Sequence, residues 1–315
     1  MARYLARRVL HALTTLLLVC TATFAIIHAA PGGPSVLADP KLTAIDRAAI
    51  EKRLGLDRPL AEQYTRWMAR VARGDLGNSF LYQVPNAQAI GERLPNTALL
   101  AGSALLLSLL IAVSLGAYCA ARQGSLIDHA VTVVASGAMA MPVFWLAMLL
   151  ILVFAVTLGV LPAGGSTTVG GAGSLGDRLA HLVLPSIVLS AALTAELLRY
   201  TRSSTRTALS QPYIRVASGK GVSTARVRWR HALRNALIPV VTVLGLQLPR
   251  LVGGAAVTET VFSWPGMGRL GVEAALSRDY PLVLAITLVI SAAVALATLL
   301  VDMVYLWIDP RIRLH

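Results

Sequence analysis

The sequence predicts an all-α polytopic membrane protein with six transmembrane helices and both termini in the cytoplasm. Of its 315 residues, 56% are hydrophobic and only 14% are charged, whereas a soluble domain carries about 25% charged residues. Several apolar runs reach the length of about 20 residues that a helix needs to cross a bilayer. Lys and Arg gather in the segments between these runs, as is typical of cytoplasmic loops.

The net charge of +13 is explained by where the basic residues lie. Nine Lys or Arg and no acidic residue lie from Arg199 to Asn235, whereas residues 31–95 hold nine basic and seven acidic residues. A charge excess on one side of the membrane reports topology. The charge therefore does not indicate a nucleic-acid partner.

The first span is expected within residues 1–30. Arg3, Arg7 and Arg8 precede an apolar run over residues 9–30. A signal peptide is the alternative, but its apolar region normally covers about 7–15 residues. We therefore expect an uncleaved first span with a cytoplasmic N-terminus.

Residues 31–95 form the long extramembrane insertion. Helix-like apolar spacing is broken at Gly55, Pro59 and Gly74, which predicts short helices on the outer face of the membrane. Two roles stay open for this insertion. It is either a solvated cap on the helix bundle or part of a dock for a substrate-delivery protein.

Residues 96–315 are expected to form a core of five transmembrane helices. The five spans are predicted at 97–121, 130–158, 179–198, 236–257 and 282–308, and Pro142 interrupts the second of them. A Gly- and Ser-rich loop at 159–177 is expected to be a flexible turn. Trp264 is expected at the membrane interface, and Gly102 and Gly116 are expected to allow close contact between helices.

The basic loop, about residues 199–235, is the segment around which the chain is organised. Pro212 suits the first turn of a helix, where its missing N–H has no intrahelical partner anyway. Gly219 and Gly221 would end that helix. A short helix between two spans can hold little ligand by itself, so the pattern favours docking onto another protein.

Polar residues inside the spans are candidates for a translocation path, because charges at mid-bilayer depth cost at least about 2.5–3.5 kcal/mol and usually face a cavity or a partner. Gln247 and Arg250 are three residues apart and share a helix face. Pairing or snorkelling of Arg250 remains an equal alternative. Asp302 is either an interhelical acceptor or a path residue, and Glu196 is expected to snorkel or to pair with Arg199.

The sequence predicts no catalytic and no metal site. Gly219-Lys220 lacks the earlier glycine of a phosphate-binding loop, and no two of the six histidines stand at the i, i+4 spacing of a metal pair. The chain is therefore expected to bind no cofactor itself. A secondary transporter and an intramembrane enzyme remain lower alternatives, and we see no inverted repeat that would favour the first.

Four motifs give a resemblance that covers nearly the whole chain. They are Tyr213-x-Arg215-x-Ala217-x-x-Lys220-Gly221 with His231 to Ala236, Gly74 to Gly77, the Trp-Pro-Gly block at Trp264, and the ending Asp309-Pro310-Arg311. The chain resembles the dipeptide, oligopeptide and nickel permeases of ATP-binding-cassette importers. It departs from the general Glu-Ala-Ala loop pattern of such permeases, since Arg215, Val216 and Ala217 stand at those positions.

The resemblance implies a type I importer permease in the bacterial inner membrane. Its expected partners are a second permease, two ATPase subunits that bind ATP and Mg, and an extracytoplasmic binding protein. The solute would be a di- or oligopeptide, with nickel chelates, glutathione or another small solute as alternatives. The short helix would be the coupling helix that docks on an ATPase, with apolar contacts from Tyr213, Ile214 and Val216 and polar ones from Arg215 and Lys220. The expected docking residues are Tyr213, Ile214, Arg215, Val216, Ala217, Ser218, Lys220 and Gly221.

Overall fold

The computed structural model describes residues 2–30, 33–37, 42–168, 170–171, 173–223 and 226–308. Within these residues the regular secondary structure is helical, apart from one isolated antiparallel bridge between Asn78 and Pro85. The chain divides into two compact units, one made of residues 1–96 and 266–295 and the other of residues 97–265 and 296–315.

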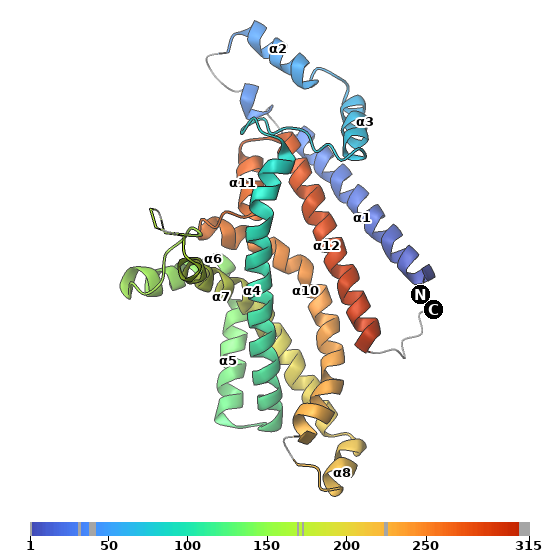
Figure 1. Cartoon of the computed structure of the whole chain (residues 1–315), viewed down its shortest axis with the longest axis vertical. Coiled ribbons are helices and arrows are strands. Elements are labelled where there is room, and N and C mark those ends of the chain that lie inside the picture. Colours follow the sequence, from blue (N-terminus) through green and yellow to red (C-terminus); the bar gives the residue numbers. More distant parts are fainter. Residues whose placement is uncertain are drawn as a thin grey trace. The chain divides into compact units, whose positions relative to one another are not determined.

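Unit 1 holds the long insertion and the helices around it (Figure 1). Its elements are α1 (Ala2–Ala29), η1 (Ser35–Leu37), α2 (Ala44–Leu54), α3 (Leu60–Val71), the start of α4 (Asn86–Ala121), α11 (Met267–Leu276) and the start of α12 (Tyr280–Ile308). Residues 266–295, which the sequence analysis grouped with the core of five transmembrane helices, belong to this unit.

Local signals set the short helices of the insertion. The side chains of Thr43 and Asp46 cap the start of α2 reciprocally, and Gly55 ends it with a φ of 70°. Such a capping box satisfies backbone N–H groups that have no intrahelical acceptor. The Tyr64 hydroxyl lies 2.7 Å from the hydroxyl of Thr21 on α1. The hydrogen bond between them joins α3 to α1.

Buried Asp279 organises the join between the insertion and α12. It accepts hydrogen bonds from the Ser79 hydroxyl, from the Leu81 N–H at 3.0 Å and from the Leu282 N–H at 3.2 Å. The last of these caps the N-terminus of α12, where free N–H groups favour a negative charge.

Unit 2 carries most of the apolar helices. Its elements are the rest of α4, α5 (Leu126–Ala140), α6 (Val143–Leu150), the π-helix η2 (Ile151–Thr157), α7 (Leu175–Leu209), α8 (Pro212–Gly219), the π-helix η3 (Val227–Ala232), α10 (Leu233–Val261) and the end of α12.

Helix α7 is the centre of unit 2. The most apolar part of α7 is 67% buried, whereas the corresponding parts of α1, α4 and α12 are 11–22% buried. Its leucines pack with α4 and α10 in one core. Gly116 of α4 permits close contact between α4 and α7, since a Cβ at Gly116 would lie 2.8 Å from the Cβ of Thr201 on α7. At Gly102, in contrast, nothing in the described structure lies within 4 Å of that position.

Pro142 turns the expected second core span into a sharp bend. Helices α5 and α6 with η2 meet at an angle of 111°. Met141 adopts an extended conformation with ψ 130°, because the ring of a following proline disfavours the helical region for the residue before it. The pair is a broken span or a re-entrant loop.

Length and composition identify four helices that can cross a membrane in the described residues, or five if the bent pair is one span. The four are α1, α4, α7 and α12, and the first part of α10 (Leu233–Gln247) is a shorter apolar helix. These elements coincide with the runs predicted from the sequence. The chain is therefore an all-helical, multi-pass protein.

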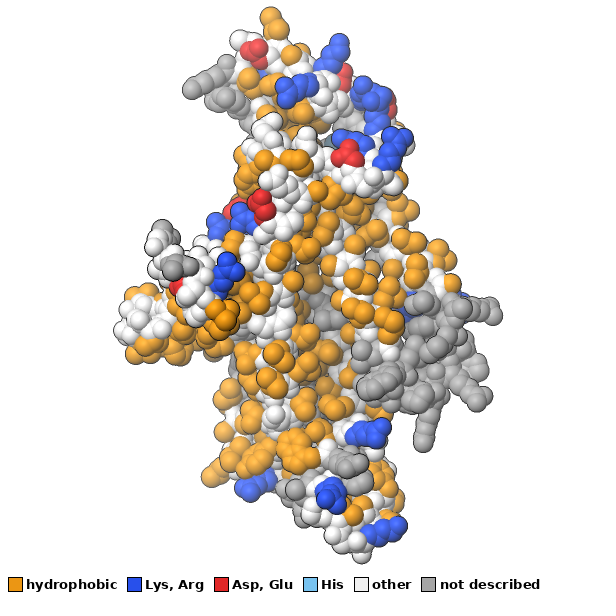
Figure 2. All heavy atoms as spheres, viewed as in Figure 1, with side chains coloured by type: hydrophobic (Ala, Val, Ile, Leu, Met, Phe, Trp, Pro, Cys, Tyr) orange, Lys and Arg blue, Asp and Glu red, His pale blue; other side chains and the backbone are white. Residues whose placement is uncertain are grey.

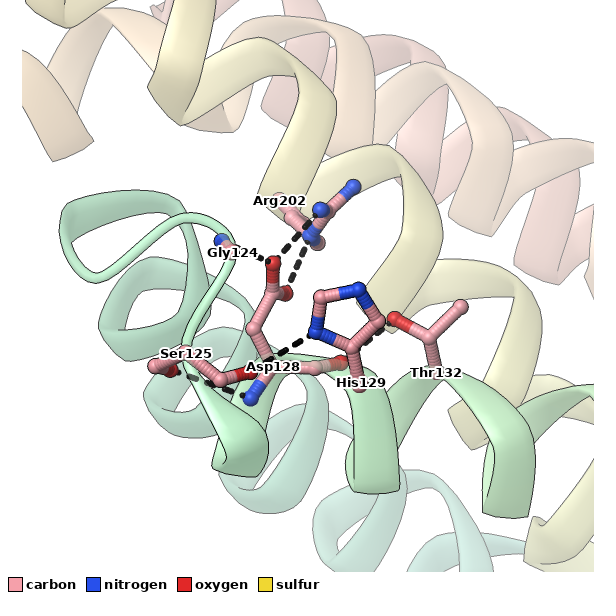
Figure 3. A network of polar contacts seen from close by, with 6 residues as sticks. All are labelled: Gly124, Ser125, Asp128, His129, Thr132 and Arg202. Atoms are coloured by element: carbon pink, nitrogen blue, oxygen red, sulfur yellow. Dashed lines mark hydrogen bonds and ion pairs between the residues drawn. The ribbon is translucent and has the colours of Figure 1, made fainter.

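An ion pair fixes the start of α5 to the last turns of α7, within the first residues of the basic segment (Figure 3). The Arg202 guanidinium donates to both carboxylate oxygens of Asp128, at 2.6 and 2.8 Å. Asp128 is 2% exposed and also accepts from the Gly124 N–H at 3.0 Å. This bidentate geometry favours one orientation of the two helices.

The loop after η2 and Trp264 both make close contacts within unit 2. The loop is tied to the end of α10, because the Gly165 N–H donates to the Phe262 carbonyl at 2.8 Å. A Cβ at Gly164 would lie 2.5 Å from the same oxygen, so only glycine fits this approach. Trp264, which the sequence allows at the membrane interface, is buried in the core of unit 2.

Candidate functional site

The basic loop contains the predicted helix with the predicted ends. Helix α8 covers Pro212–Gly219, and the proline occupies its first position. Beyond the helix the Val222 N–H donates to the Ala217 carbonyl at 3.3 Å, and Gly221 has a φ of 78°. A bond of this spacing around a left-handed glycine is the Schellman arrangement that closes a helix. The chain direction after α8 is thereby fixed.

One side of α8 is packed against the rest of the loop. Ile214 is 6% exposed and belongs to a cluster with Ala208 at the end of α7 and Val227 in η3. Ala217, three residues on, packs against the same cluster. Ile214 is also one of the residues expected to supply apolar contacts to an ATPase, and its side chain packs inside this chain. Ile214 anchors α8 to the ends of two long helices.

The other side of α8 is exposed. Tyr213 and Val216 are three residues apart and lie on one face, and Val216 is 58% exposed. The Tyr213 hydroxyl accepts a hydrogen bond from the side-chain amide of Asn235 at 2.9 Å. Arg215 and Lys220 are exposed on the same helix and beyond its end. The exposed side thus combines an apolar patch with positive charge.

Figure 2 shows Lys and Arg side chains beside hydrophobic ones around α8, with no acidic side chain on the visible face there. Such a surface suits a partner that offers an apolar recess with an acidic rim.

Trp229 adds to this surface and was not singled out by the sequence analysis. It lies on η3 and is 52% exposed. A large aromatic residue among basic residues of a loop was the signal available in the sequence. Exposed tryptophan is favoured at interfaces between proteins, so Trp229 is a further docking candidate.

A second feature of unit 2 is a cavity of about 260 Å³. Gln247 of α10 and Glu196 of α7 line it together with Met139 and Met141 at the bend after α5. From the sequence, Gln247 is a path candidate, whereas Glu196 is expected to snorkel or to pair with Arg199. The tertiary structure places both polar side chains on one cavity whose other walls are apolar.

Three predicted residues have side chains outside the described structure. The side chains of Ser218, Arg250 and Asp302 are not described, although their backbones lie in α8, α10 and α12. Their proposed roles stay predictions.

The described residues hold no group of three or more His, Cys, Asp or Glu side chains that could bind a metal ion. Buried Cys20 packs among Phe24, Trp67 and Leu284. Two features of unit 2 can serve transport: the exposed side of α8 can transmit movement, and the largely apolar cavity with Glu196 and Gln247 can accommodate a small solute.

Comparison with known proteins identifies the family of the chain. Residues 112–314 match the family described as "Binding-protein-dependent transport system inner membrane component", and residues 1–101 match its N-terminal family. The chain is 40% identical over 315 residues to the oligopeptide transport system permease protein AppB of Bacillus subtilis, covering 99% of this chain and 100% of that protein. It is 38% identical over 314 residues to the glutathione transport system permease protein GsiC of Salmonella typhimurium, covering 99% of both.

A solved structure has a similar fold. The inward-facing MetNI methionine ABC transporter aligns with a TM-score of 0.51 at 20% identity, over 70% of this chain and 97% of that one. With its helical multi-pass architecture and matches to both family profiles, the chain belongs to the inner-membrane permease components of binding-protein-dependent ABC importers.

Proposed function

We propose that the chain imports peptides as one half of a permease pair, and that α8 receives the movement of an ATPase subunit. The observation that carries the proposal is the two-sided packing of α8. Ile214 fixes one side to the chain, whereas Val216 and Tyr213 leave the other side free for a partner. Peptide and glutathione permeases among the relatives support a solute with peptide bonds.

The proposed topology has six spans with both termini in the cytoplasm. Helices α1, α4, α7 and α12 supply four spans, and α10 and the bent pair supply two more. Arg7 and Arg8 precede the apolar part of α1, and the basic loop follows α7. The positive-inside rule places both on the cytoplasmic side, where an ATPase could reach α8.

Coupling in this scheme is a difference in affinity. An ATPase state that binds the exposed side of α8 more tightly in one permease conformation shifts the population toward that conformation. Ile214 passes the movement on, because its cluster joins α8 to the end of α7 and the start of α10. Those two helices also contribute Glu196 and Gln247 to the cavity.

The cavity is the proposed part of the path that contacts solute. A peptide carries a positive amino group, a negative carboxylate and amides that donate and accept. Glu196 can attract the amino group, and Gln247 can exchange hydrogen bonds with an amide. Arg250, at i+3 from Gln247, and Asp302 remain further proposed path residues.

ATP and Mg would be bound by partner ATPase subunits, since the sequence contains no phosphate-binding loop. The proposed assembly comprises this chain, a second permease, two ATPase subunits and an extracytoplasmic binding protein. The permease family to which the chain belongs supports that composition.

The test compares two exposed valines. Val216→Lys changes the free side of α8, and Val160→Lys changes an equally exposed valine, 64% against 58%, in the loop after η2. Burying a valine contributes about 1.5 kcal/mol or more, so Val216→Lys should weaken ATPase association about tenfold or more. Val160→Lys should leave it unchanged. Equal association and uptake for the two variants would contradict docking on α8.

Uptake by the complete importer in proteoliposomes tests the solute. We expect ATP-dependent import of labelled di- and oligopeptides and no import of a nickel chelate. Import of the chelate alone would overturn the peptide assignment. Import by this chain without any ATPase subunit would instead indicate a secondary transporter.

A further inference from the structure

Unit 1 contains a cavity of about 540 Å³ whose wall is strongly basic. Six of its nineteen lining residues are Lys or Arg, and none is Asp or Glu. A site of this volume matches those that take small organic ligands. Such a charge balance favours an anionic occupant.

Two of the six cations are already partly neutralised. Arg58 and Arg66 each contact Glu62, at 2.7 and 2.8 Å. The hydrogen bond from Arg58 is the main reason that the pKa of Glu62 lies below its ordinary value. The other four, Lys52, Arg53, Arg70 and Arg73, make no ion pair within the described residues. Figure 2 shows basic side chains gathered over α3, which carries Arg66 and Arg70.

The floor of the cavity is aromatic and apolar. Trp67 and Phe24 stack with ring centroids 6.2 Å apart, and His28 lies between Phe24 and Tyr280, at 4.0 and 5.1 Å from their rings. Leu284 completes this wall. An occupant therefore meets both positive charge and hydrocarbon in the lining.

The position of the cavity on its helices identifies the class of occupant. Phe24 and His28 lie in the last turns of α1, and Tyr280 and Leu284 lie at the start of α12. Both helices are apolar and long enough to cross a membrane. Their ends lie where lipid headgroups meet water, and Trp and Tyr are enriched at that depth. On the face of α1 that carries Phe24, the side chains of Leu13 and Leu17 are exposed and offer a surface for acyl chains.

We propose that this cavity binds the phosphate headgroup of an anionic phospholipid. The free cations around Arg53 and Arg70 take the phosphate, the aromatic floor contacts the glycerol, and the acyl chains lie along α1. A soluble anion would use the cations but not the adjoining apolar surface. A bound lipid would fix α3 against α1 and α12 and so hold the insertion at the membrane surface.

The test is native mass spectrometry of the complete purified importer in neutral detergent. Phosphatidylglycerol should bind more tightly than phosphatidylcholine, which carries a phosphate but no net charge. Arg53→Gln with Arg70→Gln removes two cations, each contributing about 1 kcal/mol near an anionic headgroup. We therefore expect roughly 30-fold weaker binding of phosphatidylglycerol.

Two arginines of unit 1 outside the cavity lining serve as the control. Arg47→Gln with Arg93→Gln changes the net charge by the same amount and should retain full binding. Quenching of tryptophan fluorescence by brominated phosphatidylglycerol should decrease in Trp67→Phe. Equal binding of the two lipids, or equal loss in both double variants, would overturn the proposal. Tight binding of glycerol phosphate alone, or displacement of the lipid by a peptide, would assign the cavity to a soluble anion instead.

Discussion

Replacing Gly221 by Ala should uncouple the importer by a backbone effect alone. The φ of Gly221 is +78°, and nothing lies within 4 Å of the position that a Cβ would occupy. The substitution therefore introduces no clash, and its cost comes from the left-handed conformation, about 1–2 kcal/mol for a residue with a Cβ. The ratio of loop conformations that lack the closing turn to those that have it should therefore rise about 5- to 30-fold.

Gly219 is the matched control, two residues earlier. A Cβ there also meets nothing within 4 Å, and its φ is not positive. Alanine is a better helix former than glycine by up to about 1 kcal/mol, so Gly219→Ala should keep or strengthen α8. The stability of the closing turn in Gly221→Asn should lie between that of the wild type and that of Gly221→Ala, because asparagine tolerates the left-handed region better than alanine.

Two measurements check this series. Hydrogen exchange at the Val222 amide, which donates to the Ala217 carbonyl, should accelerate about 5- to 30-fold in Gly221→Ala. ATP-driven uptake by the reconstituted importer should fall in the order wild type, Asn, Ala. If Gly221→Ala exchanges and transports like Gly219→Ala, the argument that this glycine aims α8 is wrong.

Three further predictions concern packing in unit 2. Gly116→Ala should lower the thermal unfolding midpoint of the purified protein, because overpacking costs about 1–3 kcal/mol, whereas Gly102→Ala on the same helix should not; equal midpoints would argue against the close approach. Asp128→Asn should lower the free energy of unfolding by about 3 kcal/mol, the low end of the range for breaking a buried ion pair, because the Arg202 partner is 29% exposed. An unchanged midpoint in a denaturant titration would contradict this. Gly164→Ala should speed proteolysis of the loop at 159–177, because the new Cβ would press on the Phe262 carbonyl, and wild-type cleavage rates would count against that contact.

The ends of α8 could be predicted because they depend on neighbouring residues only. Pro212 fits a first helical turn whatever surrounds it. The left-handed conformation of Gly221 lets the Val222 N–H reach the Ala217 carbonyl, five residues earlier, and so closes the helix. The apolar runs behave in the same way, since about 20 apolar residues partition into lipid wherever they occur. Motif spacing then sufficed to indicate the permease family.

The two faces of α8 and the lining of the cavity were decided by the tertiary structure. Ile214 and Val216 are equally apolar in the sequence, and only the contacts with α7 and η3 determine that the first is buried and the second exposed. Glu196 and Gln247 are 51 positions apart, and they share a cavity because α7 and α10 pack side by side. Local patterns specify where a helix begins and ends, whereas its buried face depends on partners distant in the chain, whose positions no local pattern contains.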